Sequence, residues 1–173
     1  MINYLTGDVL KPIGTGNKLI IHCCNTIGGF GSGVAGAINK KWDGPRIEYK
    51  TLADLHSNNI PLGIVQAVKV EHDITVVNMI GQEGIGWKNG IAPIRYEAIK
   101  TCLEQVAKYA INNNCSIHAP RFGSGLAGGD WNQIEAMIIA IFIKQGISVN
   151  VYDLPIAENL TSEIEKRKQM DLL

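Results

Sequence analysis

One stretch of the sequence, residues 20–37, constrains the fold more than any other. It begins as an apolar run and passes through polar and thiol side chains. A loop with four glycines follows, Gly28, Gly29, Gly31 and Gly33, and leads into an expected helix of small residues. Glycine permits a positive φ and a close approach of the backbone to a ligand. A strand that leads through such a loop into a helix aims backbone N–H groups at phosphate. We therefore predict a loop that binds a phosphate-bearing ligand.

A second glycine loop occupies residues 121–130, between an expected strand and an expected helix for which Asp130 is the N-cap. Ligands in open α/β sheets bind beyond the carboxyl ends of the strands, so both loops are expected at one edge, around a nucleotide-sized pocket. The first loop departs from the dinucleotide fingerprint because His-Cys-Cys-Asn precedes it, and neither loop ends in the Gly-Lys-Ser/Thr of a P-loop. The alternative is that each loop is only a strand-to-helix turn.

The order of the expected elements predicts an α/β fold with a mostly parallel sheet. The expected strands cover residues 2–5, 19–24, 64–70, 74–80, 116–119 and 147–152, and the expected helices cover 34–42, 45–56, 93–113 and 131–144. The short gap between the third and fourth strands predicts an antiparallel hairpin, which makes the sheet mixed. We assign residues 1–154 to one domain and residues 155–173 to a polar helix or tail.

The composition excludes several classes of function. The 173 residues include 16 basic and 16 acidic side chains, a balance that argues against bulk binding of nucleic acid or of an anionic membrane. The N-terminus has no signal peptide pattern, and no run of 18 apolar residues is present. The four cysteines lack the spacing of a zinc site. We therefore expect reduced thiols, no metal, no cofactor and a cytoplasmic protein, and the oligomeric state stays open.

Polar side chains near the first loop are candidates for chemistry. His22 is either a hydrogen-bonded core residue or a group that transfers protons. Asn25 offers a donor and an acceptor to a ribose hydroxyl or to a water molecule. Asp8 is either a turn residue or the acceptor for an adenine amino group. Cys23 and Cys24 are better explained as buried thiols than as nucleophiles.

Four segments together resemble the macro domain family in order and spacing. They are Thr-Gly-Asp-Val at 6–9, Ile-His-Cys-Cys-Asn at 21–25 with the glycine loop to 35, Pro-Arg-Phe-Gly-Ser-Gly-Leu-Ala-Gly-Gly-Asp-Trp at 120–131, and the last strand at 149–154. Within the family, the chain is most similar to the branch of ADP-ribose-1″-phosphate phosphatases and terminal ADP-ribose glycohydrolases. Residues 78–82 with Arg95-Tyr96 also resemble small single-domain macro proteins of phages and bacteria.

The resemblance implies a three-layer α/β/α sandwich around a mixed six-stranded sheet, with a cleft for ADP-ribose. It places Asp8 and Val9 at the adenine, with Tyr152 and Leu154 bordering that end. The first loop would surround the distal ribose and the diphosphate through Gly28, Gly29, Phe30, Gly31, Ser32, Gly33 and Val34. The second loop would cradle the diphosphate through Gly123, Ser124, Gly125, Leu126 and Ala127.

The two activities of this branch need different residues. Glycohydrolases use an aspartate just after the Gly-x-Gly-Leu of the second loop, where this chain has Ala127, and a lysine after the fourth strand, where this chain has only Lys88 further along a loop. Phosphatase-like members carry His-x-Cys-Asn before the first loop, which His22, Cys24 and Asn25 match. We therefore expect hydrolysis of ADP-ribose-1″-phosphate, in which Asn25 positions the distal ribose or water and His22 assists proton transfer.

Three alternatives remain. In the first, the chain would remove ADP-ribose from protein or nucleic acid with the help of Asp130 or Lys88. In the second, it would bind ADP-ribose without chemistry. In the third, its glycine loops would be only turns in an unrelated α/β protein. Each makes a different prediction for binding and turnover of ADP-ribose derivatives.

Overall fold

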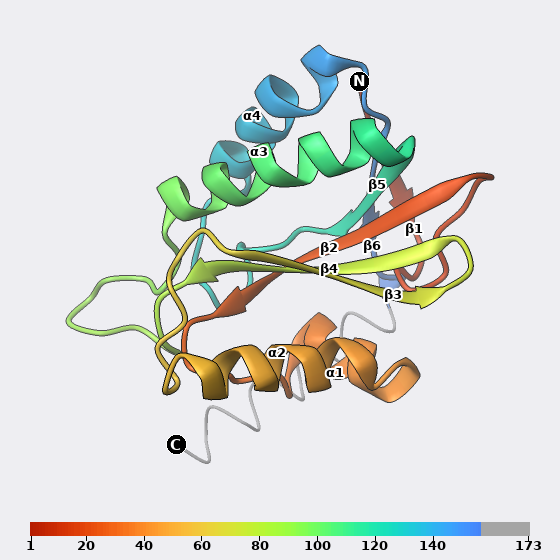
Figure 1. The fold of residues 1–173 in the computed structure, drawn as a ribbon. Coiled ribbons are helices and arrows are strands. Elements are labelled where there is room, and N and C mark those ends of the chain that lie inside the picture. Colours follow the sequence, from red (N-terminus) through yellow and green to blue (C-terminus); the bar gives the residue numbers. More distant parts are fainter. Residues whose placement is uncertain (157–173) are drawn as a thin grey trace.

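The computed structural model describes residues 1–156 of the chain. Its strands are β1 (Ile2–Thr6), β2 (Asn17–Asn25), β3 (Val65–Glu71), β4 (Ile74–Gln82), β5 (Cys115–Pro120) and β6 (Val149–Asp153). They form one sheet in the order β1-β6-β5-β2-β4-β3, in which all neighbouring pairs are parallel except the antiparallel pair β3–β4 (Figure 1). This sheet confirms the expected mixed, mostly parallel arrangement.

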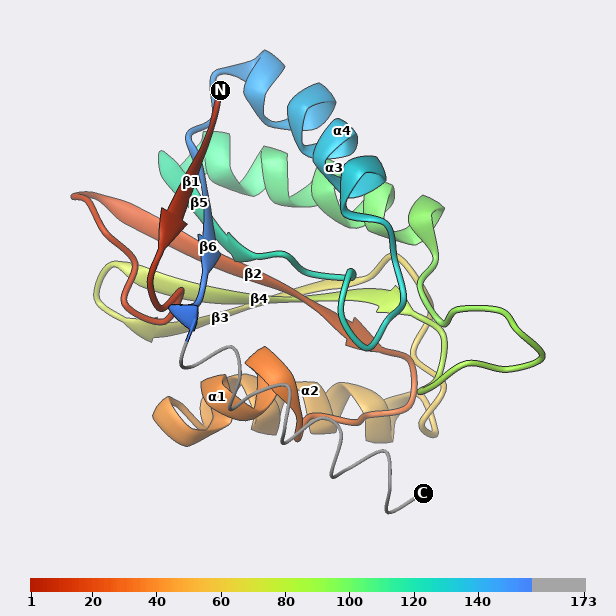
Figure 2. The ribbon, with the colours of Figure 1, turned by 180° about the vertical axis from the view of Figure 1, so that it is seen from behind.

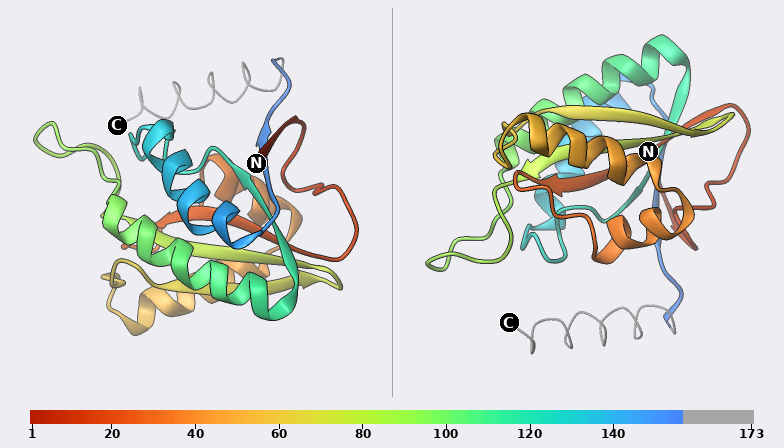
Figure 3. Two further views of the ribbon diagram at one scale, coloured as in Figure 1. Left: turned by 90° about the horizontal axis from the view of Figure 1, so that it is seen from above. Right: turned by 60° about the horizontal axis from the view of Figure 1, so that its bottom comes forward.

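Helices cover both faces of the sheet. They are α1 (Gly33–Lys41), α2 (Gly44–Leu55), α3 (Tyr96–Asn113), α4 (Trp131–Ile141) and the short 3-10 helix η1 (Ile143–Gln145). The views from opposite sides show α1 and α2 on one face and α3 and α4 on the other (Figures 1 and 2). Figure 3 shows each helix pair in front of the sheet in turn. The expected three-layer α/β/α sandwich is therefore confirmed.

The alternation of side chains along β2 divides the interior into two cores. Leu19 and Ile21 belong to the core under α3 and α4, whereas Ile20 and Cys24 belong to the core under α1 and α2. All four side chains are buried, as expected for a central strand with parallel neighbours on both sides. Because β2 is an inner strand, the first glycine loop begins near the middle of the row of strand ends.

Two helix boundaries differ from the sequence expectation. Helix α3 begins at Tyr96 and not at Pro93, because Ile94 pairs with Gln82 in an isolated bridge and its N–H donates to the carbonyl of Ala127. Helix α4 ends at Ile141, and η1 tightens the chain before Gly146 turns it with φ +75°. The side chain of Asp130 accepts a hydrogen bond from the Asn132 N–H at 2.9 Å, which confirms the expected N-cap.

A hairpin projects from the body of the fold between β4 and α3 (Figure 2). Lys88 and Ile91 exchange backbone hydrogen bonds of 3.1 and 2.9 Å, and the Asn89-Gly90 pair between them has positive φ at both positions. This is the geometry of a type I′ turn, for which Asn-Gly is the preferred sequence. The tail expected at 155–173 lies, from residue 157 on, outside the described residues.

Candidate functional site

A cavity of about 630 Å³ lies where the carboxyl ends of β1, β2, β5 and β6 meet. Its wall comes from four segments: the turn after β1, the first glycine loop with α1, the second glycine loop, and the end of β6. The lining residues are Gly7, Asp8, Val9, Leu10, Gly31, Ser32, Gly33, Val34, Gly36, Ala37, Asn39, Lys40, Pro120, Arg121, Ser124, Gly125, Tyr152, Asp153 and Leu154. The two glycine loops thus share one edge and one cavity, as the sequence predicts.

Asn25 organises the start of the first glycine loop. Its Oδ1 atom accepts hydrogen bonds from the N–H groups of Ile27 and Gly29, both at 3.0 Å, and its Nδ2 donates to the Gly29 carbonyl at 2.8 Å. The Tyr49 hydroxyl lies 2.9 Å from the same Oδ1 and 2.5 Å from the Asn25 carbonyl oxygen. Gly28 turns the chain with φ +80°, and a Cβ there would meet Ala53 at 3.0 Å. Asn25 therefore holds the loop and is nearly buried.

The N-terminus of α1 opens onto the cavity. Ser32 is its N-cap residue, yet the Ser32 side chain makes no capping hydrogen bond. The first N–H groups of a helix have no partner within the helix and carry a partial positive charge. Gly36 lets the loop approach α1 closely, since a Cβ at this position would lie 2.7 Å from the carbonyl oxygen of Gly31. These features suit an anionic group beside residues 31–34.

The second glycine loop presents further donors. Within residues 1–156, the N–H groups of Gly125 and Leu126 donate to no protein acceptor. The loop is closed by hydrogen bonds from the Gly128 N–H to the Gly125 carbonyl at 3.0 Å and from the Gly129 N–H to the Gly123 carbonyl at 2.8 Å. Its backbone shape is therefore held while Gly125 faces the cavity.

An ion pair joins the start of the second loop to β6. The guanidinium of Arg121 donates from Nε and Nη2 to the two carboxylate oxygens of Asp153, at 2.7 and 2.8 Å. This bidentate pair keeps the pKa of the Asp153 carboxyl below its usual value. Both residues line the cavity and were missed by sequence reasoning, although Arg121 directly precedes the second glycine run.

Asp8 and Tyr152 form a further part of the cavity wall, next to Asp153. One carboxylate oxygen of Asp8 accepts the Leu10 N–H at 2.9 Å, which fixes the turn after β1. The hydroxyl of Tyr152 accepts the Ile13 N–H at 3.1 Å and lies 2.8 Å from Nδ1 of the buried His118. Because that hydroxyl already accepts a hydrogen bond, its own proton is available to His118. These hydrogen bonds hold the connection between β1 and β2 against the sheet.

His22 lies under the first loop and does not line the cavity. Its side chain is fully buried between the sheet and the helices α1 and α2, and its Nε2 lies 2.7 Å from Oδ1 of Asn78. Burial lowers the pKa of His22 to about 4, while the bond to Asn78 works in the opposite direction. Phe30 packs edge-on against the imidazole with ring centroids 5.5 Å apart, and it also contacts Tyr49. The imidazole is therefore neutral near pH 7 and supports Phe30.

The four cysteines are free thiols in the structure. Burial raises the pKa of Cys23 and of Cys102 to about 12, and it also holds the pKa of Cys24 well above its usual value. Thiols with raised pKa values are poor nucleophiles near neutral pH. This agrees with the interpretation of Cys24 as a buried thiol, whereas Cys23 is only partly buried.

The cavity brings together many, but not all, of the residues expected at the site. Lining residues among them are Asp8, Val9, Gly31, Ser32, Gly33, Val34, Ser124, Gly125, Tyr152 and Leu154. The others lie outside the lining: His22, Asn25, Gly28, Gly29, Phe30, Gly123, Leu126 and Ala127. Sequence reasoning missed Gly36, Ala37 and Lys40, although they follow Gly33 on one face of α1 at helical spacing.

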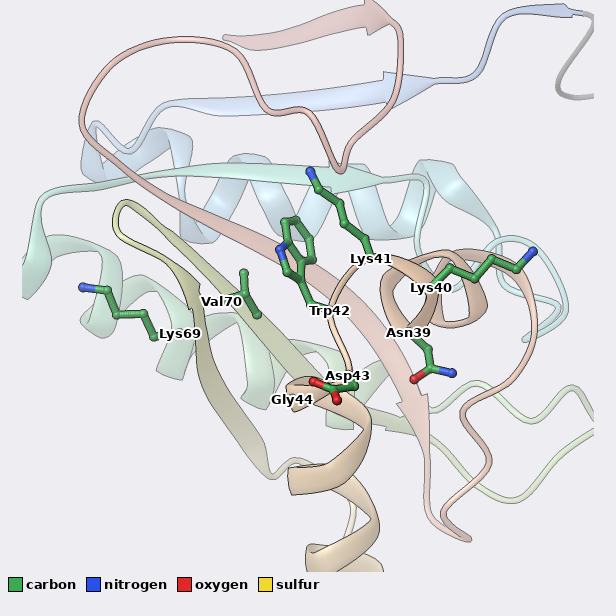
Figure 4. Close-up of a pocket in the computed structure, with 8 residues that line it drawn as sticks. All are labelled: Asn39, Lys40, Lys41, Trp42, Asp43, Gly44, Lys69 and Val70. Carbon is green, nitrogen blue, oxygen red and sulfur yellow. The ribbon is translucent and has the colours of Figure 1, made fainter.

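A second, more open hollow of about 470 Å³ adjoins the C-terminal end of α1 (Figure 4). Figure 4 shows that the side chains of Lys40, Lys41 and Lys69 point in different directions around it. The ammonium of Lys41 donates to the Leu10 carbonyl at 2.5 Å and lies 4.2 Å from the centre of the Trp42 ring. Its cations do not converge, so the cavity between the glycine loops is the better candidate site.

Residues 1–156 contain no group of three or more His, Cys, Asp or Glu side chains placed to share a metal ion. Among the helices that the structure describes, none is long and apolar enough to cross a membrane.

Comparisons with known proteins agree with this geometry. A family model described as Macro domain matches residues 21–138. The solved structure of a protein of unknown function from Bacteroides thetaiotaomicron superposes with a TM-score of 0.85 and 45% identity, over 89% of this chain and 98% of that chain. An ADP-ribose 1″-phosphate phosphatase of Candida albicans is 26% identical over 145 residues, 80% of this chain and 92% of that protein. A chromodomain-helicase-DNA-binding protein 1-like of Danio rerio is 26% identical over 159 residues, and this chain spans only 15% of its length.

Proposed function

Because this chain belongs to the macro domain family, we propose that it binds ADP-ribose in the cavity between its two glycine loops and hydrolyses ADP-ribose-1″-phosphate to ADP-ribose and phosphate. The observation that carries the proposal is the cavity itself, in which loops from four strand ends converge. The similarity to a Candida albicans ADP-ribose 1″-phosphate phosphatase over most of both chains supports this choice of substrate.

The chemistry of the cavity walls supports one orientation of the ligand. Asp8 is the lining carboxylate that is not paired with Arg121, and it suits an adenine amino group, with Tyr152 and Leu154 in the same wall. The diphosphate then lies between the α1 N-terminus and Gly125, where N–H groups supply hydrogen bonds to anionic oxygens. The distal ribose and its phosphate extend toward the loop that Asn25 holds. The remaining expected binding residues, from Gly28 to Phe30 and from Gly123 to Ala127, shape these loops.

Hydrolysis requires a water molecule to attack phosphorus while the bond to the ribose oxygen breaks and that oxygen gains a proton. Backbone N–H groups of the loops stabilise the charge on the phosphate oxygens. Asn25 has one amide hydrogen beyond its bond to Gly29, and this hydrogen can orient the distal ribose or the water. His22 is fully buried behind Phe30, so its burial favours a positioning role over direct contact with the substrate.

The test combines binding and turnover in the same preparations. Calorimetry should show that ADP-ribose binds in a one-to-one complex, and that Asp8→Ala weakens binding by roughly tenfold or more because an acceptor for the adenine is lost. Asp54→Ala removes an exposed carboxylate on α2 that does not line the cavity, so it is the matched control and should bind as the wild type does. A colorimetric assay then follows phosphate released from ADP-ribose-1″-phosphate.

The alternatives give other outcomes. Tight binding without phosphate release identifies a module that binds ADP-ribose without chemistry. Loss of label from ADP-ribosylated protein or nucleic acid, with no phosphate release, identifies an ADP-ribosyl hydrolase. If calorimetry shows no binding heat, ADP-ribose is not the ligand and the glycine loops are only turns.

A further inference from the structure

The hairpin formed by residues 83–92 touches both glycine loops. On its first strand, the Gly84 N–H donates to Oγ1 of the buried Thr26 at 2.9 Å. The next side chain, Ile85, lies over Gly29, because a Cβ built on that glycine would be 2.7 Å from Cδ1 of Ile85. This strand of the hairpin is therefore packed on the first loop.

Trp87 makes the matching contact with the second loop. A Cβ on Gly128 would lie 2.7 Å from Cζ2 and 3.0 Å from Cε2 of the Trp87 indole. Gly128 has φ +71°, so both its backbone conformation and this close approach require glycine. Its N–H donates to the carbonyl of Gly125, which lines the cavity. A single hydrogen bond thus connects Gly128, which lies under Trp87, to the cavity wall at Gly125.

The base of the hairpin is held firmly. The Glu83 N–H donates to the Pro93 carbonyl at 2.9 Å, and the Arg95 guanidinium pairs with the Glu83 carboxylate at 2.7 Å. The Arg95 guanidinium also donates to the carbonyls of Ala92 and Ile94. An anchored base lets contacts at Ile85 and Trp87 set the positions of the two loops relative to each other.

We propose that Trp87 is a positioning residue, which holds the second glycine loop in its ligand-binding shape and, with Ile85, fixes the spacing of the two loops. Trp87 is 61% exposed and belongs to neither hydrophobic core, and its indole contacts Gly128. The consequence for ligand affinity rests on the proposed binding of ADP-ribose, whereas the effect on loop order does not.

The first experiment measures loop order without a ligand. Hydrogen exchange of peptides from residues 121–130 should be faster in Trp87→Ala than in the wild type, while Trp87→Phe restores part of the protection. Ile91→Ala is the matched control, because Ile91 lies on the same hairpin, is 62% exposed and is not among the side chains nearest to Gly29 or Gly128. Equal exchange in the wild type and Trp87→Ala would overturn the inference.

The second experiment measures affinity. Calorimetry should give a dissociation constant for ADP-ribose that is about tenfold higher in Trp87→Ala and within about twofold of the wild type in Ile91→Ala. Wild-type affinity in Trp87→Ala contradicts the positioning role. If the wild type itself does not bind ADP-ribose, the proposed function fails, and the exchange experiment still decides whether Trp87 orders the loop.

Discussion

The Nε2 atom of His22 lies 2.7 Å from Oδ1 of Asn78, inside the layer that joins β2 and β4 to the helices α1 and α2. Because an amide oxygen only accepts, Nε2 carries the imidazole hydrogen and Nδ1 has a lone pair. The Asn78 Nδ2 group in turn donates to the carbonyl of Pro45 and to Oε1 of Gln66. This network fixes the orientation of the imidazole under Phe30, while burial keeps His22 neutral.

The two buried histidines predict how stability depends on pH. Burial lowers the pKa of His22 and of His118 to about 4 from an ordinary value of 6.5. Between these values the unfolded chain binds protons that the folded chain does not bind, so the free energy of unfolding should fall as the pH falls from 6.5 toward 4. Urea unfolding at several pH values measures this slope. The slope should be smaller in His118→Gln, and a flat profile in the wild type would contradict neutral buried imidazoles.

Removal of the Asn25 amide should damage the first loop. Asn25→Ala leaves the Ile27 and Gly29 N–H groups without their acceptor, so we expect a loss of about 2 kcal/mol in stability and about 100-fold in phosphate release. Tyr49→Phe removes one hydroxyl donor, which lies 2.5 Å from the Asn25 carbonyl oxygen and 2.9 Å from Oδ1, and should cost about 1 kcal/mol. Denaturant unfolding and initial rates check both values. Unchanged turnover in Asn25→Ala would remove Asn25 from the mechanism.

A methyl group at Gly36 should clash with the backbone of the first glycine loop. Alanine favours a helix over glycine by about 1 kcal/mol, yet the added Cβ would lie 2.7 Å from the Gly31 carbonyl oxygen. We expect Gly36→Ala to weaken ADP-ribose binding by about tenfold. Gly44→Ala, at the start of α2, is the control, since its Cβ would meet only Val68 at an ordinary 3.6 Å. Equal calorimetric affinities for the two variants would contradict this prediction.

The fold could be predicted from the sequence because local patterns and topology agreed. The apolar run before the first loop predicts the central strand β2, and the short gap before Ile74 predicts the β3–β4 hairpin. The start of α3 could not be predicted from Pro93, which is a normal first residue of a helix. A tertiary contact between Ile94 and Ala127 keeps that segment extended, and no local pattern reveals it.

The cavity was only partly predictable for a similar reason. The motif around Gly31–Val34 marks one wall, but the same run includes Phe30, whose ring turns inward onto His22. Lys40 and Asp153 reach the cavity through the path of α1 and the order of strands, so their roles depend on the assembled sheet. The Asn89-Gly90 pair is a local signal for the projecting hairpin. The many glycines around it favour an irregular loop instead, so the hairpin was not predicted.

We propose that this macro domain removes the terminal phosphate of ADP-ribose-1″-phosphate, and ³¹P nuclear magnetic resonance of the reaction tests this proposal most directly. With the wild-type protein, we predict that the phosphomonoester signal is replaced by that of inorganic phosphate while the diphosphate signals of ADP-ribose persist. Asn25→Ala should leave the phosphomonoester signal in place over the same time. A phosphomonoester signal that persists with the wild-type protein, at concentrations where calorimetry shows the site to be filled, would contradict the account.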